Sequence, residues 1–313
     1  MSPSSSDTLR DAVALVTGAS GFIGRHLTAL LAREGASVHA TTRGDAPRDA
    51  EHSALSWHRL DLHDTAAVRE LVGRVRPDVV FHLASLVKGA RDRALVLPAF
   101  EANLASTVRL LDAAAEHGVR RFVQLGSLEE PPIDEPARAP ASPYAAAKTA
   151  ATAYCRLYAE LYGLPVAIAR VFMVYGPGPQ DLQKLVPYVA RTLLAGDTPT
   201  LSSGTRAVDW IYVEDVVRAL ARLAVAPEAD GRVIDVGSGR LVTVADVVRR
   251  LYRLAGRSDE PPFGSRDDRP LEQVRRADVD RTASVLDWRP QVGLDDGLDR
   301  TLDWFRRAAT APS

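Results

Sequence analysis

The sequence predicts an α/β fold in which a doubly wound parallel sheet is accompanied by a smaller C-terminal lobe. Three observations support this prediction. Apolar runs of strand length alternate with segments of helical periodicity over the first 171 residues. A glycine-rich turn joins the first apolar run to the first helical segment. The pattern then changes after the glycine- and proline-rich stretch at residues 175–179.

The N-terminal elements alternate regularly along the chain. Short apolar runs predict strands at residues 12–17, 37–42, 56–60, 78–83, 121–125 and 165–171. Helical spacing predicts helices between them at residues 22–33, 64–75, 98–117 and 143–162. Gly35 and Gly118 follow two of these helices, where glycine commonly ends a helix. Strands that alternate with helices in this way are typical of a parallel sheet.

The C-terminal part is predominantly helical. Its predicted helices span residues 182–195, 214–226, 243–255 and 294–307, with short strands at 208–213 and 232–236. Residues 257–276 are polar, contain proline and have little periodicity. The pattern predicts a disordered tail at 1–11, a sheet domain at 12–180 and a mainly substrate-binding lobe at 181–313, partly interleaved with the sheet domain.

Composition excludes several classes of protein. The formal net charge of −1 provides no global attraction to nucleic acid or to a membrane surface. The single cysteine, Cys155, excludes an intramolecular disulfide and is expected to be a buried structural thiol. The serine-rich N-terminus has no apolar segment typical of a signal peptide, and we expect no apolar run to approach the length of a membrane span. We therefore expect a cytoplasmic protein that binds neither nucleic acid nor membrane.

The glycine-rich turn predicts a Rossmann-type dinucleotide-binding site. Its glycines have GxxGxxG spacing, which allows a tight turn, close approach of a pyrophosphate and close packing of helix on strand. The helix N-terminus adds amide donors and the positive end of the helix dipole. The candidate contacts are Gly18, Ser20, Gly21, Phe22, Ile23 and Gly24.

The end of the second predicted strand bears on the choice of cofactor. NAD-preferring sites usually carry an acid there, whereas this chain has Arg43 and no acid before Asp45. Arg43, assisted by Arg25, is suited to a 2′-phosphate, so NADP(H) is favoured and NAD(H) remains possible. Asp61, followed by Leu62, is placed to accept from the adenine amino group, or alternatively to cap the next helix.

The segment from Ser142 to Lys148 predicts acid–base chemistry. Ser142 is a good N-cap and Pro143 suits the first helical position. On the helix that follows, Tyr144 and Lys148 are four residues apart and share a face. An ammonium beside a phenol favours the phenolate, so we expect Lys148 to lower the pKa of Tyr144.

The ordered set of motifs resembles the extended short-chain dehydrogenase/reductases, the group of nucleotide-sugar epimerases, dehydratases and reductases. The resemblance extends from about Val13 to Phe305. The matching motifs are Thr17 to Gly24, Asp61-Leu62, His82-Leu83-Ala84, Asn103, Ser127, Tyr144 with Lys148, Arg170 to Pro177, Asp209 to Asp215, and Asp287 to Pro290.

This resemblance implies roles for residues at the nicotinamide end of the site. Ser127 would hydrogen-bond the substrate oxygen, Tyr144 would exchange its proton, and Lys148 would bind the nicotinamide ribose and tune Tyr144. Further cofactor contacts would come from Leu83, Ala84, Ser85, Asn103 and Val171. His82, inside a predicted strand, is expected to be a packing residue.

Departures from the family pattern limit the reactions and the substrate-phosphate contacts that the resemblance implies. The dehydratases of the family carry Asp-Glu after the catalytic Ser or Thr, and this chain has Leu128 in the Asp position. The usual substrate-phosphate Asn is Met173, and Val208 replaces an arginine of the family. Candidate substrate contacts are Lys88, Ser127, Glu129, Met173, Arg206 and Arg269, with Arg266 as a further available arginine. The default interpretation of Glu129 and Glu130 is a solvated loop; alternatively, Glu129 is a base or a sugar contact.

Three functions follow as hypotheses. The favoured one is an NADPH-dependent ketoreductase of a nucleotide-linked keto-sugar, most plausibly a 4-keto-6-deoxyhexose. The alternative is an NAD-dependent nucleotide-sugar 4-epimerase, and a remote third is a non-catalytic dinucleotide-binding sensor. The resemblance also implies a homodimer formed through the helices at 98–117 and 144–162. No metal site is expected.

Overall fold

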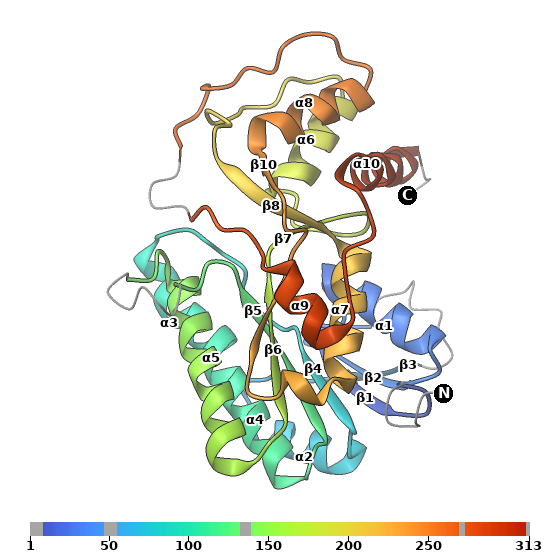
Figure 1. Cartoon of the computed structure of the whole chain (residues 1–313), viewed down its shortest axis with the longest axis vertical. Coiled ribbons are helices and arrows are strands. Elements are labelled where there is room, and N and C mark those ends of the chain that lie inside the picture. The colour runs from blue at the N-terminus through green and yellow to red at the C-terminus, as the bar shows by residue number, and fades with distance from the viewer. Residues whose placement is uncertain (1–8, 47–54, 132–138, 269–272, 311–313) are drawn as a thin grey trace. The chain divides into compact units, whose positions relative to one another are not determined.

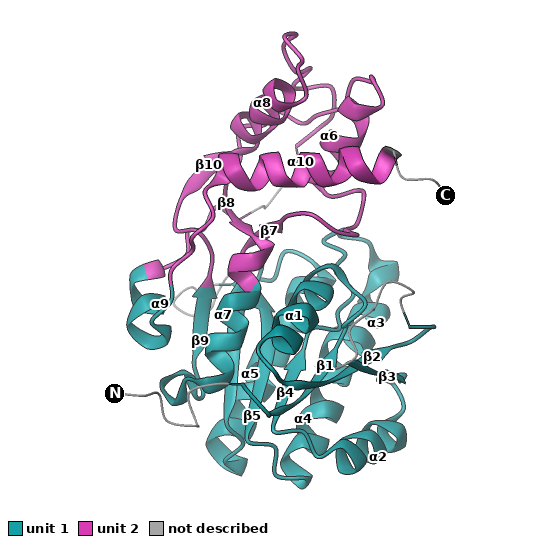
Figure 2. Cartoon of the chain, turned by 90° about the vertical axis from the view of Figure 1, so that its right-hand side faces the viewer, with its two compact units in different colours: residues 1–171, 217–235, 280–288 teal, residues 172–216, 236–279, 289–313 magenta. Residues whose placement is uncertain are grey.

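The computed structural model describes residues 9–46, 55–131, 139–268 and 273–310. The chain forms two compact units, coloured separately in Figure 2. The first comprises residues 1–171, 217–235 and 280–288, and the second comprises residues 172–216, 236–279 and 289–313. The first unit's N-terminal segment therefore ends at Val171, so the predicted division at 180/181 falls inside the second unit.

The first unit is built on a seven-stranded sheet, which confirms the predicted fold class (Figure 1). The strand order is β3-β2-β1-β4-β5-β6-β9, so the order reverses between β1 and β4. The pairs from β3 through β6 are parallel. The strands are β1 (Val13–Thr17), β2 (Ser37–Thr42), β3 (Leu55–Arg59), β4 (Val79–His82), β5 (Arg121–Ser127), β6 (Val166–Val171) and β9 (Val233–Val236). In such sheets ligands bind beyond the carboxyl ends of the strands, at the point of reversal.

Helices cover this sheet. The helical elements that lie wholly within the first unit are α1 (Phe22–Arg33), α2 (Thr65–Val75), η1 (Arg93–Leu95), α3 (Val96–Ala99), η2 (Phe100–Ala105), α4 (Ser106–Glu116), α5 (Pro143–Tyr162) and η3 (Pro227–Ala229). Two more, α7 (Val213–Val225) and α9 (Val279–Leu286), run from one unit's residues into the other's. The helix α9 is absent from the prediction, because its eight residues occupy too little sequence to establish a helical period.

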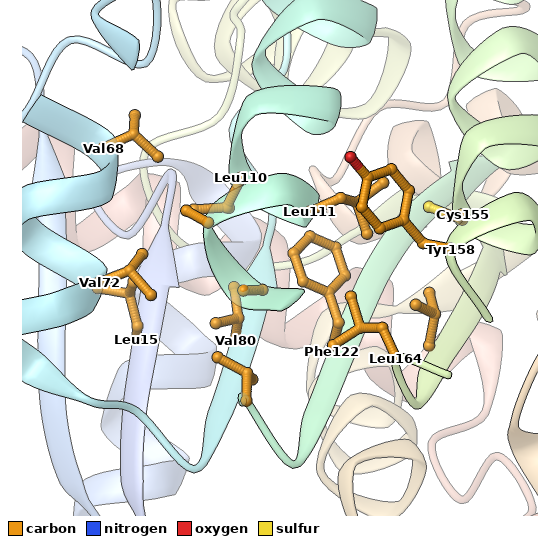
Figure 3. Packing of buried hydrophobic residues seen from close by; sticks show 14 of the residues in the cluster. Leu15, Val68, Val72, Val80, Leu110, Leu111, Phe122, Cys155, Tyr158 and Leu164 are labelled. Atoms are coloured by element: carbon orange, nitrogen blue, oxygen red, sulfur yellow. The ribbon is translucent and has the colours of Figure 1, made fainter. Parts of the chain in front are cut away.

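The main core lies between the sheet and α2, α4 and α5 (Figure 3). Leu15, Val80 and Phe122 come from three neighbouring strands and are fully buried. Leu111 of α4 and Cys155 of α5 pack in the same cluster, which confirms Cys155 as a buried thiol. Burying a large apolar side chain of this kind contributes about 1.5–3 kcal/mol, so this layer holds α5 firmly on the sheet.

Helical structure between β4 and β5 begins earlier than the predicted start at residue 98 and continues to Glu116. It contains a π-helical segment at Phe100–Ala105, and Asn103 inside that segment is fully buried. The helical run Arg93–Glu116 contains an 18-residue window with a mean hydropathy of 1.3, so it is long and apolar enough to cross a membrane, contrary to the expectation that no run approaches that length. Core helices meet the same criterion, and Leu110 and Leu111 of this run belong to the main core.

The second unit has its own small sheet and helical layer. The strand order is β10-β8-β7, with β8 parallel to β7 and antiparallel to β10. Its elements are β7 (Met173–Tyr175), β8 (Ala207–Tyr212), β10 (Leu241–Thr243), α6 (Leu185–Leu194), α8 (Val244–Leu254) and α10 (Leu294–Thr310). The strands β7 and β10 are absent from the prediction, because three residues give no alternating pattern.

Two buried aspartates hold irregular segments onto this second unit. Asp209 of β8 accepts hydrogen bonds from the backbone amides of Ser238, Gly239 and Ala277 at 2.6–2.9 Å. Asp215 accepts from the amides of Gln291 and Val292. Asp209 and Asp215 therefore have a structural role in this motif, because their carboxylates accept hydrogen bonds from backbone amides of irregular segments.

Residues 9–11, part of the predicted N-terminal tail, are ordered. Residues 1–8 lie outside the described part of the chain, but Leu9 is buried and the amide of Asp11 donates to the carbonyl of Gly35. The apolar side chain of Leu9 gives this segment something to bury, so the prediction of a disordered tail is wrong for residues 9–11.

Candidate active site

The glycine-rich turn brings β1 and β4 into close contact at their carboxyl ends. Gly18 has a φ of +70°, and a Cβ there would lie 2.6 Å from the backbone nitrogen of Ala84. A Cβ on Gly24 would lie 2.2 Å from the carbonyl oxygen of Gly18. Both positions therefore require glycine: a side chain on Gly18 would collide with the backbone after β4, and one on Gly24 would push the first turn of α1 away from the glycine turn.

The N-terminus of α1 is suited to an anion. Gly21 is the N-cap and supplies no side-chain acceptor, so the first amides of the helix keep their donors for another group. Arg25 is held at this end by a hydrogen bond from its Nε to the carbonyl of Ser20, at 3.2 Å. Uncapped amides, a helix dipole and a nearby guanidinium fit the pyrophosphate of a dinucleotide. Such a cofactor would supply a nicotinamide ring that reversibly accepts two electrons and a proton as hydride.

The predicted adenosine contacts lie at the neighbouring strand ends. Arg43 is exposed directly after β2, which pairs with β1. Asp61 is also exposed, and its Oδ1 accepts from the backbone amide of His63. The N-cap of α2 is Asp64, which accepts from Ala67 at 3.0 Å. The alternative that Asp61 caps this helix is therefore wrong, and its carboxylate remains a candidate for the cofactor.

Asn103 organises the loop after β4. Its Oδ1 accepts from the amide of Leu86 at 2.7 Å and from the hydroxyl of Ser85 at 2.9 Å. Its Nδ2 donates to the carbonyl of Leu86. Through these hydrogen bonds Asn103 shapes the loop that carries Leu83, Ala84 and Ser85, and its contact with a cofactor stays a prediction.

A buried histidine supports the same region. His82 Nδ1 lies 2.6 Å from the hydroxyl of Thr17, and its Nε2 lies 3.1 Å from that of Thr107. Burial lowers the pKa of His82 to about 3, so the ring is neutral at physiological pH. His82 is thus a packing residue, as predicted, and it links β1 to α4 beneath the glycine turn.

The helix α5 presents Tyr144 and Lys148 beside the end of β5. Ser142 caps it by accepting from the amide of Ala145 at 3.1 Å, and Pro143 is the first helical residue, as predicted. The side-chain hydroxyls of Ser127 and Ser85 are near enough to the Tyr144 phenol to lower its pKa. Lys148 donates from Nζ to the carbonyl of Leu125 at 2.8 Å. The structure thus assembles Ser127, Tyr144 and Lys148 around one point at the carboxyl edge of the sheet.

The expected direction of the Tyr144 pKa shift is wrong. The pKa is raised, mainly because the buried phenol is desolvated, and the carboxylates of Glu129 and Glu130 raise it further. The hydrogen bonds from Ser127 and Ser85 oppose this shift but are weaker. Burial also lowers the pKa of Lys148 to about 8. The four-residue spacing correctly places Tyr144 and Lys148 on one face of α5, but burial of the phenol, and not a neighbouring ammonium, dominates the pKa of Tyr144.

The two acids after Ser127 have different environments. Glu129 lies near the N-cap of α5, with Oε2 3.5 Å from the hydroxyl of Ser142. A Cβ on Gly89 would lie 3.3 Å from Glu129 Oε1, so this carboxylate also faces the loop after β4. Glu130, in contrast, is only 3% exposed. The default prediction of a solvated loop is therefore wrong for Glu130, since its side chain turns into the protein.

The remaining predicted contacts are spread over the two units. Val171 is buried at the end of β6, and Lys88 is exposed in the loop after β4. In the second unit, Met173 begins β7 and Arg206 donates to the carbonyl of Gln273 at 3.2 Å. Arg269 lies outside the described residues. Within the described ranges, no three His, Cys, Asp or Glu side chains are grouped to hold a metal ion.

Comparisons with known proteins agree with this geometry. A model of the NAD-dependent epimerase/dehydratase family matches residues 14–237. A Mycolicibacterium smegmatis protein named UDP-glucose 4-epimerase is 34% identical, over 93% of this chain and 98% of its own. An Actinoplanes protein named dTDP-glucose 4,6-dehydratase is 31% identical, over 93% and 97%. The structure of a Thermus thermophilus UDP-glucose 4-epimerase complex with NAD is 30% identical, covers 94% and 99%, and superposes with a TM-score of 0.81.

Proposed function

The chain belongs to the NAD-dependent epimerase/dehydratase family, and from this premise we propose that it is a nucleotide-sugar 4-epimerase that uses NAD. The 4-epimerase, which the sequence analysis gave as the alternative, thus replaces the ketoreductase as the favoured function. Relatives named 4-epimerases support it, as does the 30% identical structure of a UDP-glucose 4-epimerase complex with NAD. The observation that carries it is the grouping of Ser127 and Tyr144 at the strand edge beside the glycine turn.

The chain's own residues fit a reversible oxidation of a sugar hydroxyl. Burial favours the neutral phenol, so Tyr144 must first lose its own proton. As the phenolate it is placed to take the hydroxyl proton as the carbonyl forms and to return it after the sugar has presented its other face. Ser127 is placed to hold the oxygen during both steps, because its hydroxyl lies near enough to the phenol to lower the pKa of Tyr144. Lys148, a buried cation on the same helix face, favours the deprotonated state of Tyr144 electrostatically.

Leu128 distinguishes this proposal from dehydration. In the dehydratases of the family, an Asp occupies the position directly after the catalytic Ser or Thr. Leu128 is apolar and 6% exposed, so it supplies no proton to a leaving hydroxyl group. Epimerisation needs no group there.

The decisive assay combines turnover with identification of the bound nucleotide. We expect purified protein to convert UDP-glucose to UDP-galactose, or another nucleotide sugar to its 4-epimer, without net consumption of NAD. Denaturation should release NAD. Net oxidation of NADPH by a nucleotide-linked keto-sugar would favour the reductase instead. Cofactor binding with no turnover of any nucleotide sugar would favour the non-catalytic sensor.

Arg43 is the observation that keeps the reductase as a second candidate. It is exposed at the end of β2, where a 2′-phosphate would lie if NADP were bound. If Arg43 serves that phosphate, Arg43→Ala should weaken NADPH binding about tenfold or more and NADH binding little, since a charge-assisted hydrogen bond contributes about 1.5–3 kcal/mol. Fluorescence titration with both cofactors measures this. Arg74→Ala, at an exposed arginine of α2, is the control. If Arg43→Ala weakened NADPH and NADH binding equally, Arg43 would have no role in recognising the 2′-phosphate.

We also propose that the protein is a homodimer. The helical run after β4 and the helix α5 carry large apolar side chains exposed to solvent, an arrangement that favours a protein interface. They are Val96, Leu97, Phe100, Tyr154, Leu157, Leu161 and Tyr162.

Two of these side chains, Leu97 at 73% exposure and Leu161 at 70%, are suited to a test. Leu97→Asp with Leu161→Asp should convert a dimer to a monomer in sedimentation velocity, because two charges would enter an apolar interface. Leu182→Asp, at an exposed leucine of the second unit, should leave the mass unchanged. A wild-type protein that sediments as a monomer at micromolar concentration would disprove the dimer.

A further inference from the structure

Glu130 lies directly behind the assembled site and has no assigned role. It follows β5 in the turn that carries Ser127. Its Oε1 accepts from the Ser127 backbone amide at 2.6 Å. Its Oε2 accepts from the hydroxyl of Thr152 at 2.7 Å. With both oxygens bonded and 3% of the residue exposed, this side chain is unavailable to a substrate.

The position of Thr152 relates Glu130 to the reactive face of α5. Tyr144, Lys148 and Thr152 follow one another at four-residue spacing and therefore share one face of the helix. The Glu130 carboxylate meets this face one turn beyond Lys148. A Cβ on Gly126 would lie 2.7 Å from Glu130 Oε1, so the carboxylate also packs closely against the last residues of strand β5.

A buried carboxylate is unfavourable unless charges and donors compensate it. Here Thr152 and the Ser127 amide supply donors, while Arg170 and Lys148 supply positive charge. Arg170 is itself paired with Asp235, at 3.1 Å, so it is already largely neutralised. Lys148, in contrast, donates only to the neutral carbonyl of Leu125 among its described hydrogen bonds. The negative charge of Glu130 is therefore the counter-charge that most favours an ammonium at Lys148.

We propose that Glu130 is a positioning residue of the active site: it holds the Ser127 backbone in place and keeps Lys148 charged, without touching the substrate. The inference deepens the proposed function and rests on it for the catalytic consequence. It explains why this turn carries a second acid, Glu130, whose side chain points away from the site.

Other titratable groups surround this pair, and their effects on it are limited. From β4, His82 faces Lys148 but is neutral, with a pKa of about 3. From α5, burial raises the pKa values of both Cys155 and Tyr144, which keeps the thiol and the phenol uncharged. Glu129 acts on Tyr144. Among the groups that act on Lys148, Glu130 has the largest favourable effect on the ammonium.

Lysine NMR provides a direct test, because the whole chain contains only three lysines, Lys88, Lys148 and Lys184. Selective ¹³C labelling at Cε should give three signals, assigned by substitution of Lys88 and Lys184. The wild-type pKa of Lys148 should be about 8. Glu130→Gln keeps the size and an acceptor for Ser127 but removes the charge, so it should lower that pKa by about one unit or more.

The control is Asp209→Asn, which removes the charge of a buried carboxylate that accepts from three backbone amides of the second unit and is not among the groups that act on Lys148. We expect it to lower the melting temperature and to leave the Lys148 titration unchanged. The same two variants should differ in catalysis: the alkaline limb of kcat should move to lower pH in Glu130→Gln only. A Lys148 titration that is unchanged in Glu130→Gln, or shifted equally in Asp209→Asn, would overturn the proposal.

A second variant serves if Glu130→Gln does not fold. Burial raises the pKa of Glu130, while the Thr152 hydrogen bond opposes that rise. Thr152→Val should therefore move the protonation of Glu130, seen as a second inflection in the pH titration of the Lys148 signal, to higher pH. An inflection that does not move would contradict the proposed contact. The NMR measurements need no substrate. A protein that is inactive on nucleotide sugars would therefore overturn the proposed function, whereas the role of Glu130 would still be decided by the Lys148 titration.

Discussion

Tyr144→Phe should lower kcat by about 10²–10⁴-fold, the usual contribution of a positioned general acid–base group. The substitution removes only the hydroxyl, which lies near the hydroxyls of Ser127 and Ser85. The ring stays packed against its surroundings, so the melting temperature and the cofactor affinity should change little. Turnover of UDP-glucose and fluorescence titration with NADH measure the two effects separately.

Tyr252→Phe is the matched control for this experiment. Tyr252 is 2% exposed in the second unit, and its hydroxyl has no hydrogen-bond partner among the described residues. Removing that hydroxyl should leave kcat unchanged. If Tyr144→Phe retained turnover similar to Tyr252→Phe, the acid–base role would have to pass to another residue, with Glu129 the first to examine because its charge acts on Tyr144.

Gly24→Ala should abolish measurable cofactor binding. The added Cβ would lie 2.2 Å from the carbonyl oxygen of Gly18 and 2.7 Å from the Cα of Ala19. Both contacts are to backbone, so either the turn or the first turn of α1 must move, and the amides that face the pyrophosphate would lose their arrangement. We also expect a loss of about 1–3 kcal/mol in the free energy of unfolding from overpacking.

The control for this prediction is Gly293→Ala. A Cβ there would meet no atom within 4 Å. Isothermal titration calorimetry with NAD, alongside urea unfolding, should show normal binding and stability for this variant. NAD affinity near wild type in Gly24→Ala would mean that the turn tolerates displacement, which would exclude the glycine turn as the principal pyrophosphate site.

The sequence predicted the fold class and the main strands and helices because their signals are local. The period of the apolar residues identified β1 to β6, and Ser142 with Pro143 identified the start of α5. The same local rules placed Tyr144 and Lys148 on one helix face. Very short elements such as β7 and β10 escaped prediction, because they consist of three residues each and are defined by their pairing with β8.

By itself, the sequence thus determined the order of the elements, the glycine turn and the pair of Tyr144 and Lys148, all of which depend on neighbours within a few residues. Only the tertiary structure decided that the pKa of Tyr144 rises, that Asn103 holds a loop and that Glu130 is buried. These properties depend on desolvation and on hydrogen bonds between segments far apart in the chain. Glu129 and Glu130 are adjacent acids in the sequence, and only the packing of α5 against the end of β5 gives them different environments.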